Sequence, residues 1–127
     1  MKIPKTLTIA GSDSGGGAGI QADLKTFAAL GVYGASVITA ITAQNTLGVK
    51  ASAGISTDLV DSQLEAVLSD IGADSVKTGM LFNEAIIETV SGRLGYNRVP
   101  CLVVDPVMVA TSGDRLLSES GVSAMRE

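Results

Sequence analysis

Four segments of the chain carry residue types that bind small polar or charged molecules, and each follows a short apolar run. They are residues 11–19, 43–46, 78–81 and 105–114. We expect the apolar runs before them to be parallel β-strands. Parallel α/β sheets bind ligands at the carboxyl ends of their strands. The spacing therefore predicts one binding site built from four loops at one edge of a sheet.

The first of these segments is rich in glycine. Four of the fifteen glycines fall within residues 15–19, ahead of a predicted helix. Such a turn favours anions, because free backbone N–H groups and the helix dipole both attract negative charge. It is not a Walker A motif, since Gly17 and Ala18 replace the Lys and Ser/Thr that this motif requires. A turn that lets strand and helix pack closely would account for only two or three of the glycines.

Gly17, Gly19 and Ala22 match the G-x-G-x-x-A spacing of a dinucleotide-binding turn. A dinucleotide site also needs an acidic residue about 20 residues further on, at the end of the second strand, to hold the ribose. No Asp or Glu occurs between Asp23 and Asp58. The sequence therefore does not favour a dinucleotide.

Four polar residues in or near these segments are candidates for ligand contacts. Asp23 could hold a hydroxyl or amine of a substrate, or simply complement the dipole of the first helix. Gln44 could read the edge of a heterocycle, because its amide both donates and accepts, or face solvent. Lys77 is either an ion-pair partner or a charge directed at a phosphate. Asp105, before a proline, could serve metal or phosphate chemistry, or stabilise a turn.

The rarity or absence of some residue types excludes several classes of catalytic and metal site. The absence of histidine excludes Ser-His-Asp triads and histidine-ligated metals. The single Cys101 excludes an internal disulfide and a thiolate zinc cluster, and we expect it to be a packing residue at the start of a strand. Met80 and Val107 could be apolar walls of a site or plain core. A net charge of -4 argues against a nucleic-acid surface.

The apolar pattern predicts the elements that position these residues. Strands are expected at residues 6–10, 34–42, 75–78 and 101–104, with a weaker strand or loop at 48–55. Helices are expected at residues 18–30, at 58–71 and from Asn83 to about Gly95, and a helical pattern begins at 118–127.

The ends of these elements and their burial also follow from the pattern. Thr57 and Asn83 are the expected N-caps, and Gly31, Gly72 and Gly95 the expected helix stops. The runs at 34–42 and 101–104 resemble strands buried on both faces. Alternating strands and helices predict an α/β fold with a parallel sheet.

Composition indicates one folded and soluble unit. Hydrophobic residues make up 46% of the chain and charged residues 17%, which is enough apolar surface for a core. No signal peptide and no run of 18 apolar residues is visible, so we expect a cytoplasmic protein without a membrane partner. The helical pattern at 118–127 stops without a Gly or Pro, which suggests that the chain is truncated.

Four segments of the chain resemble the motifs of hydroxymethylpyrimidine/phosphomethylpyrimidine kinases of thiamine biosynthesis, in the same order and at the same spacing. These segments are residues 8–27, 39–46, 76–80 and 104–110. That family belongs to the ribokinase-like superfamily, which also contains pyridoxal kinases. The resemblance implies a three-layer α/β/α fold with a mostly parallel sheet, and a homodimer. It also implies phosphorylation, with ATP and Mg²⁺, of the hydroxymethyl group of a pyrimidine and then of the resulting monophosphate.

The same resemblance assigns roles to individual residues. The pyrimidine pocket would be lined by Gly11, Ala18 and Asp23. Gln44 would form hydrogen bonds with the aminopyrimidine edge. The two faces of the ring would pack against Met80 and Val107. Asp105 would lie towards the metal and the phosphates, and Lys77 falls on the cofactor side without a derived role. Thr111 departs from the lysine expected in many relatives, so the charged contact that this lysine would make with a phosphate is absent here.

The family continues for about as many residues again, with an Asn-x-x-Glu motif and a late Gly-Thr-Gly-Cys/Asp motif that do not occur here. The resemblance therefore implies that residues 1–127 are the N-terminal, substrate-binding part of a single ribokinase-like domain, without its ATP-binding part. We expect no catalytic residue in this chain, and no activity from it alone. The alternatives are a pyridoxal kinase-like enzyme and a non-catalytic module that binds an aminopyrimidine.

Overall fold

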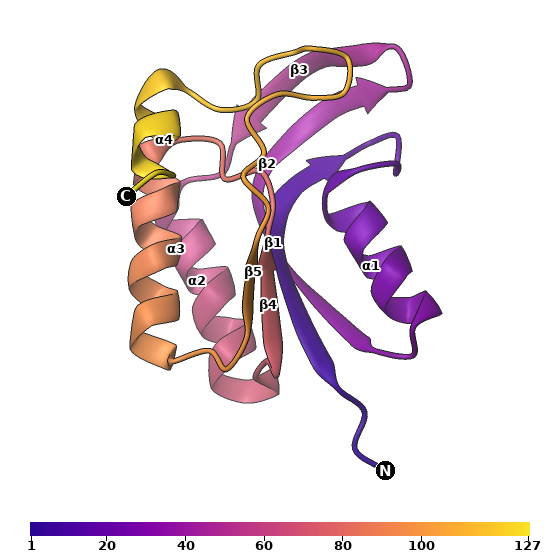
Figure 1. Ribbon diagram of the computed structural model, residues 1–127, viewed down its shortest axis with the longest axis vertical. Helices are drawn as coiled ribbons and strands as arrows, with labels where there is room; N and C mark the ends of the chain where they lie inside the picture. The colour runs from indigo at the N-terminus through magenta and orange to yellow at the C-terminus, as the bar shows by residue number, and fades with distance from the viewer.

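Strands and helices alternate as expected in the computed structural model, which describes residues 1–127. A five-stranded sheet lies between α1 on one face and α2, α3 and α4 on the other (Figure 1). The elements are β1 (Lys5–Asp13), α1 (Gly19–Ala29), β2 (Tyr33–Asn45), β3 (Gly48–Gly54), α2 (Thr57–Ala66), the π-helical turn η1 (Val67–Ile71), β4 (Ser75–Thr78), α3 (Glu84–Asn97), β5 (Leu102–Val104) and α4 (Glu119–Ala124). None of the helices is both long and apolar enough to cross a membrane.

The strand order is β3-β2-β1-β4-β5. β1, β2, β4 and β5 are parallel, and only β3 is antiparallel, as the second strand of a hairpin with β2. The expectation of a mostly parallel sheet is therefore confirmed. The carboxyl ends of the four parallel strands share one edge, and the four chemistry-bearing loops lie there together.

The main core fills the space between the sheet and the helices α2 and α3. Its fully buried side chains alternate along β1 and recur at helical spacing on α2 and α3. They include Leu7, Ile9, Val37, Val60, Leu64, Val76 and Ile86. Each buried aliphatic side chain contributes about 1.5–3 kcal/mol. Because α1 buries only Ile20 whereas α3 buries four residues, the α2–α3 side provides most of this stabilisation.

Two predicted helix boundaries are wrong. The N-cap of α2 is Ser56 rather than Thr57, because the Ser56 hydroxyl accepts the N–H of Leu59. α3 continues through Gly95 to Asn97 and ends where Arg98 adopts a left-handed conformation, with φ 47°. The Asn97 amide bonds to the carbonyl of Arg93, one turn earlier, and supports this extra turn. The Asn83 cap and the stops at Gly31 and Gly72 are confirmed, both glycines having positive φ.

The expected burial of two strands is also corrected. Leu102, Val103 and Val104 of β5 are about half exposed, at 47%, 56% and 51%, and Cys101 before them is exposed rather than packed. The reason is that β5 pairs only with β4 and nothing covers its other edge. β2 is buried only in part, since Ile41 is 55% exposed.

Candidate active site

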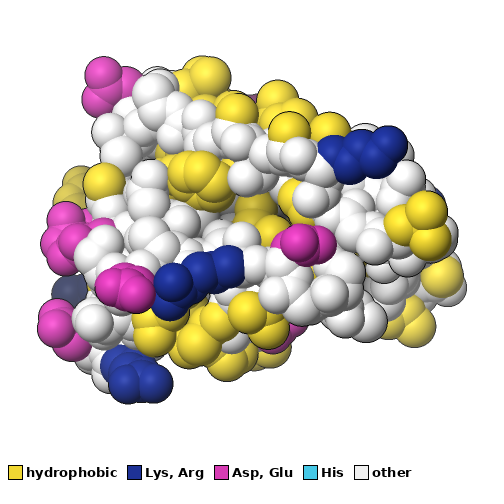
Figure 2. All heavy atoms as spheres, turned by 90° about the horizontal axis from the view of Figure 1, so that it is seen from above, with side chains coloured by type: hydrophobic (Ala, Val, Ile, Leu, Met, Phe, Trp, Pro, Cys, Tyr) yellow, Lys and Arg dark blue, Asp and Glu magenta, His cyan; other side chains and the backbone are white.

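A cavity of about 350 Å³ opens at the carboxyl ends of the parallel strands. Figure 2 looks down on this edge and shows a hollow with hydrophobic side chains inside and charged side chains on its rim. Its lining includes all eight residues that the sequence singled out: Gly11, Ala18, Asp23, Gln44, Lys77, Met80, Asp105 and Val107. Residues from the ends of β1, β2 and β4, from α1 and from the loops that follow β4 and β5 therefore converge on one site. The ligand atom that each would contact stays a prediction.

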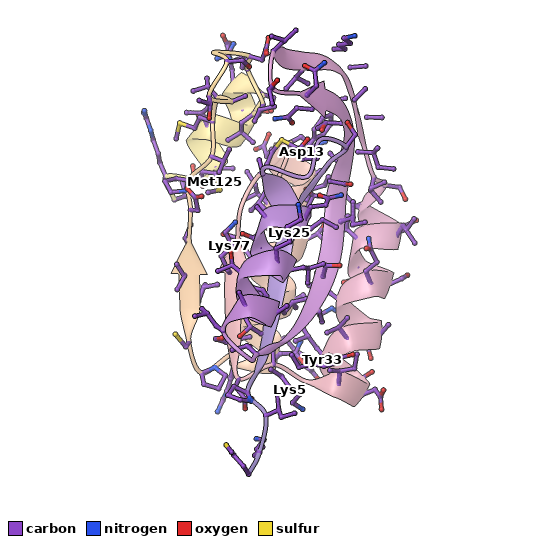
Figure 3. All side chains as sticks on the ribbon, turned by 90° about the vertical axis from the view of Figure 1, so that its right-hand side faces the viewer. Lys5, Asp13, Lys25, Tyr33, Lys77 and Met125 are labelled. Atoms are coloured by element: carbon purple, nitrogen blue, oxygen red, sulfur yellow. The ribbon has the colours of Figure 1, made fainter.

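An ion pair forms part of the cavity wall. Lys77 on β4 donates from Nζ to Oδ2 of Asp23 on α1 at 2.8 Å, and the hydroxyl of Thr8 donates to the same oxygen at 2.6 Å. The side chains of Lys77 and Asp23 are only 23% and 18% exposed. Figure 3 shows Lys77 beside α1. The sequence left two roles open to Lys77. The structure shows the ion pair with Asp23, while a contact between Lys77 and a phosphate stays a prediction.

The ion pair leaves one oxygen of the Asp23 carboxylate available to a ligand. One carboxylate oxygen is held by Lys77 and Thr8, and Oδ1 makes no hydrogen bond within the chain. Asp23 therefore keeps one carboxylate oxygen that can accept a hydrogen bond from an amine or a hydroxyl in the cavity.

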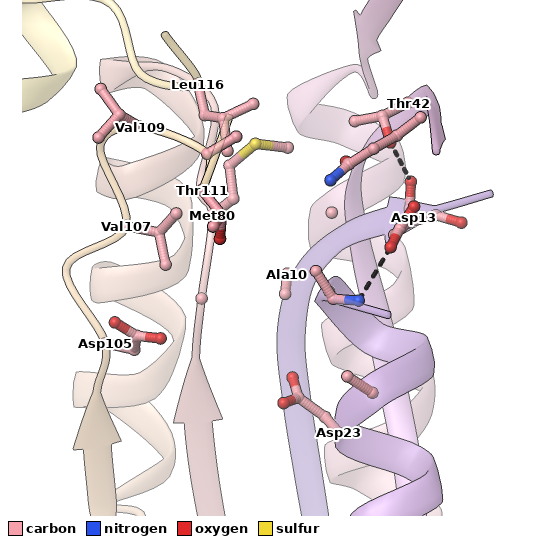
Figure 4. Close-up of a pocket in the computed structure, with 18 of the residues that line it drawn as sticks. Ala10, Asp13, Asp23, Thr42, Met80, Asp105, Val107, Val109, Thr111 and Leu116 are labelled. Atoms are coloured by element: carbon pink, nitrogen blue, oxygen red, sulfur yellow. Dashed lines mark hydrogen bonds between the residues drawn. The ribbon is translucent and has the colours of Figure 1, made fainter. Parts of the chain in front are cut away.

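Asp105 lies on the opposite wall. Figure 4 shows Asp105 and Val107 on one side, Asp23 on the other and Met80 between them. Asp105 is exposed, and its carbonyl accepts the N–H of Val107 at 2.8 Å in a tight turn. No three His, Cys, Asp or Glu side chains cluster anywhere in the chain. A single carboxylate suits Mg²⁺ only where phosphates and waters complete the shell, so Asp105 fits a Mg²⁺–nucleotide complex better than a site built from protein ligands alone.

The glycine-rich loop contradicts the expectation of an anion cradle open to a ligand. Its inward-facing N–H groups are already taken by Asp13, which is 6% exposed. One Asp13 oxygen accepts from Gly15 at 2.8 Å, and the other accepts from Gly17 and Ala18 at 2.9 Å each. The chain thus supplies its own anion, and these three amides are not free to hold a phosphate or pyrophosphate.

Close packing within the chain accounts for the lack of a side chain at Gly11 and Gly19, two positions for which the sequence suggested contact with a ligand. A Cβ on Gly11 would stand 2.4 Å from Cε of Met80, and one on Gly19 would stand 2.3 Å from the carbonyl oxygen of Gly11. Sequence reasoning overlooked Asp13, although an aspartate two residues before a run of glycines is a signal for side-chain bonds to loop amides.

Gln44 sits where β2 carries an irregularity in its pairing with β3. Its backbone is fixed on both sides by Ser14, whose hydroxyl bonds to the N–H and the carbonyl of Gln44 at 2.8 and 2.7 Å. Its side-chain oxygen accepts weakly from Thr42 at 3.2 Å. The amide nitrogen has no partner in the chain and remains available to a ligand.

The loop after β5, which lines the cavity, is anchored by Asp114. Oδ2 of Asp114 accepts from the Ser112 hydroxyl at 2.5 Å and from the N–H of Val49 at 3.0 Å. The bond to Val49 ties this loop to the β2–β3 hairpin. These two donors, the Ser112 hydroxyl first, hold the pKa of Asp114 below its ordinary value of 3.8.

Because the pKa of Asp114 is lowered, its hydrogen bond with the N–H of Val49 should be lost in acid. A carboxylate with a lowered pKa contributes its stabilisation fully above the ordinary value and loses it as pH falls through the native pKa. We expect the amide resonance of Val49 to shift in an NMR titration with a midpoint below 3.8, and D114N to abolish that shift. A midpoint at or above 3.8 in the parent chain contradicts the assignment.

A second prediction concerns Asp13. Asp13→Asn offers one acceptor oxygen for three donors and turns an NH₂ group towards another N–H, so part-buried hydrogen bonds to a carboxylate are lost. A hydrogen bond to a charged group contributes about 1.5–3 kcal/mol. We expect a lower urea midpoint and faster amide exchange at Gly15, Gly17 and Ala18. Asp70→Asn, the same change at an exposed aspartate without side-chain partners, is the control, and equal effects of the two variants would refute this role.

Several other lining residues were not singled out individually from the sequence. They are Ala10, Ser12, Asp13, Thr42, Gly79, Val109, Ala110 and Leu116. Gly19, Ala22 and Thr111, which were discussed above, line the cavity as well. Most fall inside the four segments that the sequence indicated. Leu116 lies beyond them and reaches the cavity because the chain folds back, with its N–H bonded to the carbonyl of Met108 at 2.9 Å.

Comparison with known proteins agrees with this geometry. Residues 13–127 match the model of the family described as phosphomethylpyrimidine kinase. The chain is 52% identical over 130 residues to the hydroxymethylpyrimidine/phosphomethylpyrimidine kinase of Bacillus subtilis, a match that covers 100% of this chain and 47% of that protein. The chain spans about half the length of such curated relatives.

Solved structures give the same result. The crystal structure of phosphomethylpyrimidine kinase from Clostridium difficile superposes with a TM-score of 0.90 at 52% identity, over 98% of this chain and 53% of that one. A pyridoxal kinase from Staphylococcus aureus, in complex with AMP-PCP and pyridoxal, superposes with a TM-score of 0.77 at 44% identity, over 84% of this chain and 40% of that one.

Proposed function

Because the chain belongs to the phosphomethylpyrimidine kinase family, we propose that it forms the pyrimidine-binding part of a ribokinase-like kinase domain. The complete enzyme would transfer phosphate from ATP to the hydroxymethyl group of hydroxymethylpyrimidine, and then to the monophosphate. One observation carries this proposal: the eight residues expected from the sequence all line a single cavity at the carboxyl edge of the sheet.

The cavity suits a small aminopyrimidine. Gln44 offers an amide that can accept from an exocyclic amine and donate to a ring nitrogen. Asp23 offers a charged acceptor for a second N–H or O–H group of the ligand. Met80 and Val107 provide apolar surfaces for the two ring faces, and Gly11 lets the Met80 side chain pack closely against β1 beside the ring.

The phosphoryl-transfer machinery would have to come largely from outside this chain. Transfer depends on groups that neutralise and position the γ-phosphate. Here the loop amides bind Asp13 and Lys77 binds Asp23, so Asp105 is the one carboxylate lining the cavity that makes no hydrogen bond within the chain, and it could face Mg²⁺ and ATP. We therefore propose that the chain binds pyrimidine but does not phosphorylate it.

A second candidate ligand is pyridoxal. The Staphylococcus aureus kinase that shares this fold was solved with pyridoxal, which is also a ring of pyrimidine size bearing a hydroxymethyl group. A module that only holds an aminopyrimidine is the non-catalytic alternative. Gln44 favours the aminopyrimidine, since its amide matches an amino group beside a ring nitrogen.

Titration of the ¹⁵N-labelled chain with hydroxymethylpyrimidine, and separately with pyridoxal, tests these proposals. We expect shifts confined to residues around the cavity, with a dissociation constant on the order of 1 mM, equivalent to about −4 kcal/mol. ATP consumption should stay at background. Stronger binding of pyridoxal would favour the second candidate, and no shift with either ligand would overturn both. Phosphorylation of hydroxymethylpyrimidine by this chain alone would refute the proposal that the chain binds pyrimidine without phosphorylating it.

The homodimer and the cytoplasmic location expected from the resemblance are proposals as well. A soluble kinase that draws on ATP and a small metabolite suits the cytoplasm. Light scattering of the purified protein tests the dimer, which predicts twice the monomer mass of 12.8 kDa.

A further inference from the structure

The hydroxyl of Thr39 is a buried polar group that the site described above does not use. Thr39 lies on β2 and is 0% exposed. Its hydroxyl donates at 2.6 Å to the backbone carbonyl of Met80, in the loop that follows β4. Because β1 lies between β2 and β4 in the sheet, this hydrogen bond reaches across β1. No backbone N–H bonds to the Met80 carbonyl, so Thr39 is its partner within the chain.

The loop that contains Met80 has a strained backbone. Phe82, two residues further on, has φ 71°, in the left-handed region that a bulky residue rarely adopts. Such a conformation persists only where its surroundings hold it, and it is typical of ligand-binding segments. Here the Phe82 ring packs against Gly54 at the end of β3, where a Cβ would stand 2.5 Å from the ring. Gly54 therefore leaves the space that the ring occupies.

The same loop is held at both ends and in its middle. The N–H of Gly79 donates to the carbonyl of Ile9 on β1 at 2.8 Å, and Asn83 caps α3 at the other end of the loop. Between these points Thr39 and Gly54 provide the two contacts described above. Neither Thr39 nor Gly54 lines the cavity, so any effect of either residue on a ligand has to pass through this loop.

Met80 is the residue through which the loop presents a side chain to the cavity. It is 7% exposed, and its terminal methyl group packs so closely on Gly11 that a Cβ there would stand 2.4 Å from Cε. Figure 4 shows the Met80 sulfur in the gap between the wall that carries Asp105 and the wall that carries Asp23. A thioether makes favourable contacts with aromatic rings, but its three rotatable bonds let it move. The place of this side chain therefore depends on the backbone that carries it.

We propose that Thr39 is a positioning residue for ligand binding. Its hydroxyl, together with the contact between Phe82 and Gly54, fixes residues 79–82 so that the Met80 side chain lies against one face of a bound ring. This inference rests on the function proposed above, because it requires an aromatic ring in the cavity. Without the hydroxyl, the buried carbonyl of Met80 has no partner, and the loop is expected to shift until that carbonyl reaches water.

Thr39→Val tests this inference, because valine keeps the shape of threonine and removes the hydroxyl. NMR of the chain labelled at the methionine methyl groups follows Met80 directly, and Met80→Leu identifies its signal. We expect Thr39→Val to move the Met80 methyl signal and to weaken binding of hydroxymethylpyrimidine roughly three- to tenfold. Thr39→Ser keeps the hydroxyl and should restore both. Thr6→Val, the matched control, removes a hydroxyl that bonds to Ser75 near the other end of β1, and should change neither.

A role of Thr39 in stability alone gives a different result. Thr39→Val would then lower the urea midpoint but leave the Met80 signal and the affinity of the folded chain unchanged, and this result would overturn the inference. If Thr39→Val does not fold, Gly54→Ala replaces it, because the added Cβ displaces the Phe82 ring and should move the same signal. Its control is Gly92→Ala, where a Cβ meets nothing within 4 Å.

The two readouts also separate this inference from the proposed function. If the parent chain binds neither hydroxymethylpyrimidine nor pyridoxal, the proposed function fails. The Met80 methyl signal is measured without a ligand, so an unchanged signal in Thr39→Val overturns the positioning role whether or not the parent binds. If the parent binds and Thr39→Val binds equally well, the positioning role fails while the proposed function stands.

Discussion

Gly19→Ala is expected to destabilise the chain by about 3 kcal/mol or more. Gly19 has φ +60°, a left-handed conformation that costs a residue with a Cβ about 1–2 kcal/mol. The added Cβ would also stand 2.3 Å from the backbone oxygen of Gly11, which cannot move without distorting β1. Such overpacking costs about 1–3 kcal/mol. For a domain whose total stability is about 5–15 kcal/mol, this is a large fraction.

Urea unfolding followed by circular dichroism measures this effect, and Gly95→Ala is its matched control. Gly95 lies within α3, and a Cβ there meets nothing within 4 Å. Alanine in a helix is favoured over glycine by about 0.8–1 kcal/mol, so the control should raise the midpoint. The same substitution thus has opposite effects at two positions. A loss below about 1 kcal/mol at Gly19 would show that the loop relaxes around the methyl group.

The same loop shows where sequence reasoning reaches its limit. The run of glycines correctly indicated a turn between a strand and a helix, because glycine spacing is visible in the sequence. Whether the amides face a ligand or the protein depends on backbone torsions at positions such as Gly16 and Gly19, both of positive φ. The occupant, Asp13, therefore emerged only from the structure.

β5 illustrates a different limit. The four apolar residues 101–104 are typical of a strand buried on both faces, and the sequence predicted that burial. Burial, however, depends on what packs against the strand, and β5 is an edge strand whose three side chains stay about half exposed. By contrast, the convergence of Asp23, Gln44 and Asp105 on one cavity was predictable, because parallel strands place their carboxyl ends on a common edge.

The link between Asp23 and Lys77 required the strand order as well. The two residues are far apart in the sequence, and they meet because β4 lies beside β1, which carries Thr8. Sequence alone left Lys77 with two roles, since the pairing of β1 with β4 is a long-range choice. This ion pair now decides how substitutions of Asp23 should be designed.

Asp23→Asn is expected to remove most of the affinity of the cavity for hydroxymethylpyrimidine. The amide keeps the shape of the side chain but replaces a charged acceptor. Hydrogen bonds to charged groups contribute about 1.5–3 kcal/mol, which corresponds to roughly a 10- to 150-fold loss of affinity. From a starting constant on the order of 1 mM, the NMR titration should then show no saturable shifts.

The substitution also leaves the Lys77 ammonium without its carboxylate, so a loss of binding could reflect a loss of structure. The double variant Asp23→Asn/Lys77→Met removes both charges and should recover stability while still failing to bind. Lys77→Met alone frees Oδ2 of Asp23, whose remaining partner is Thr8, and should weaken binding less than Asp23→Asn does. Asp70→Asn should bind like the parent. If folded Asp23→Asn binds pyrimidine as tightly as the parent, Asp23 does not contact the ligand, and its role is confined to the pair with Lys77.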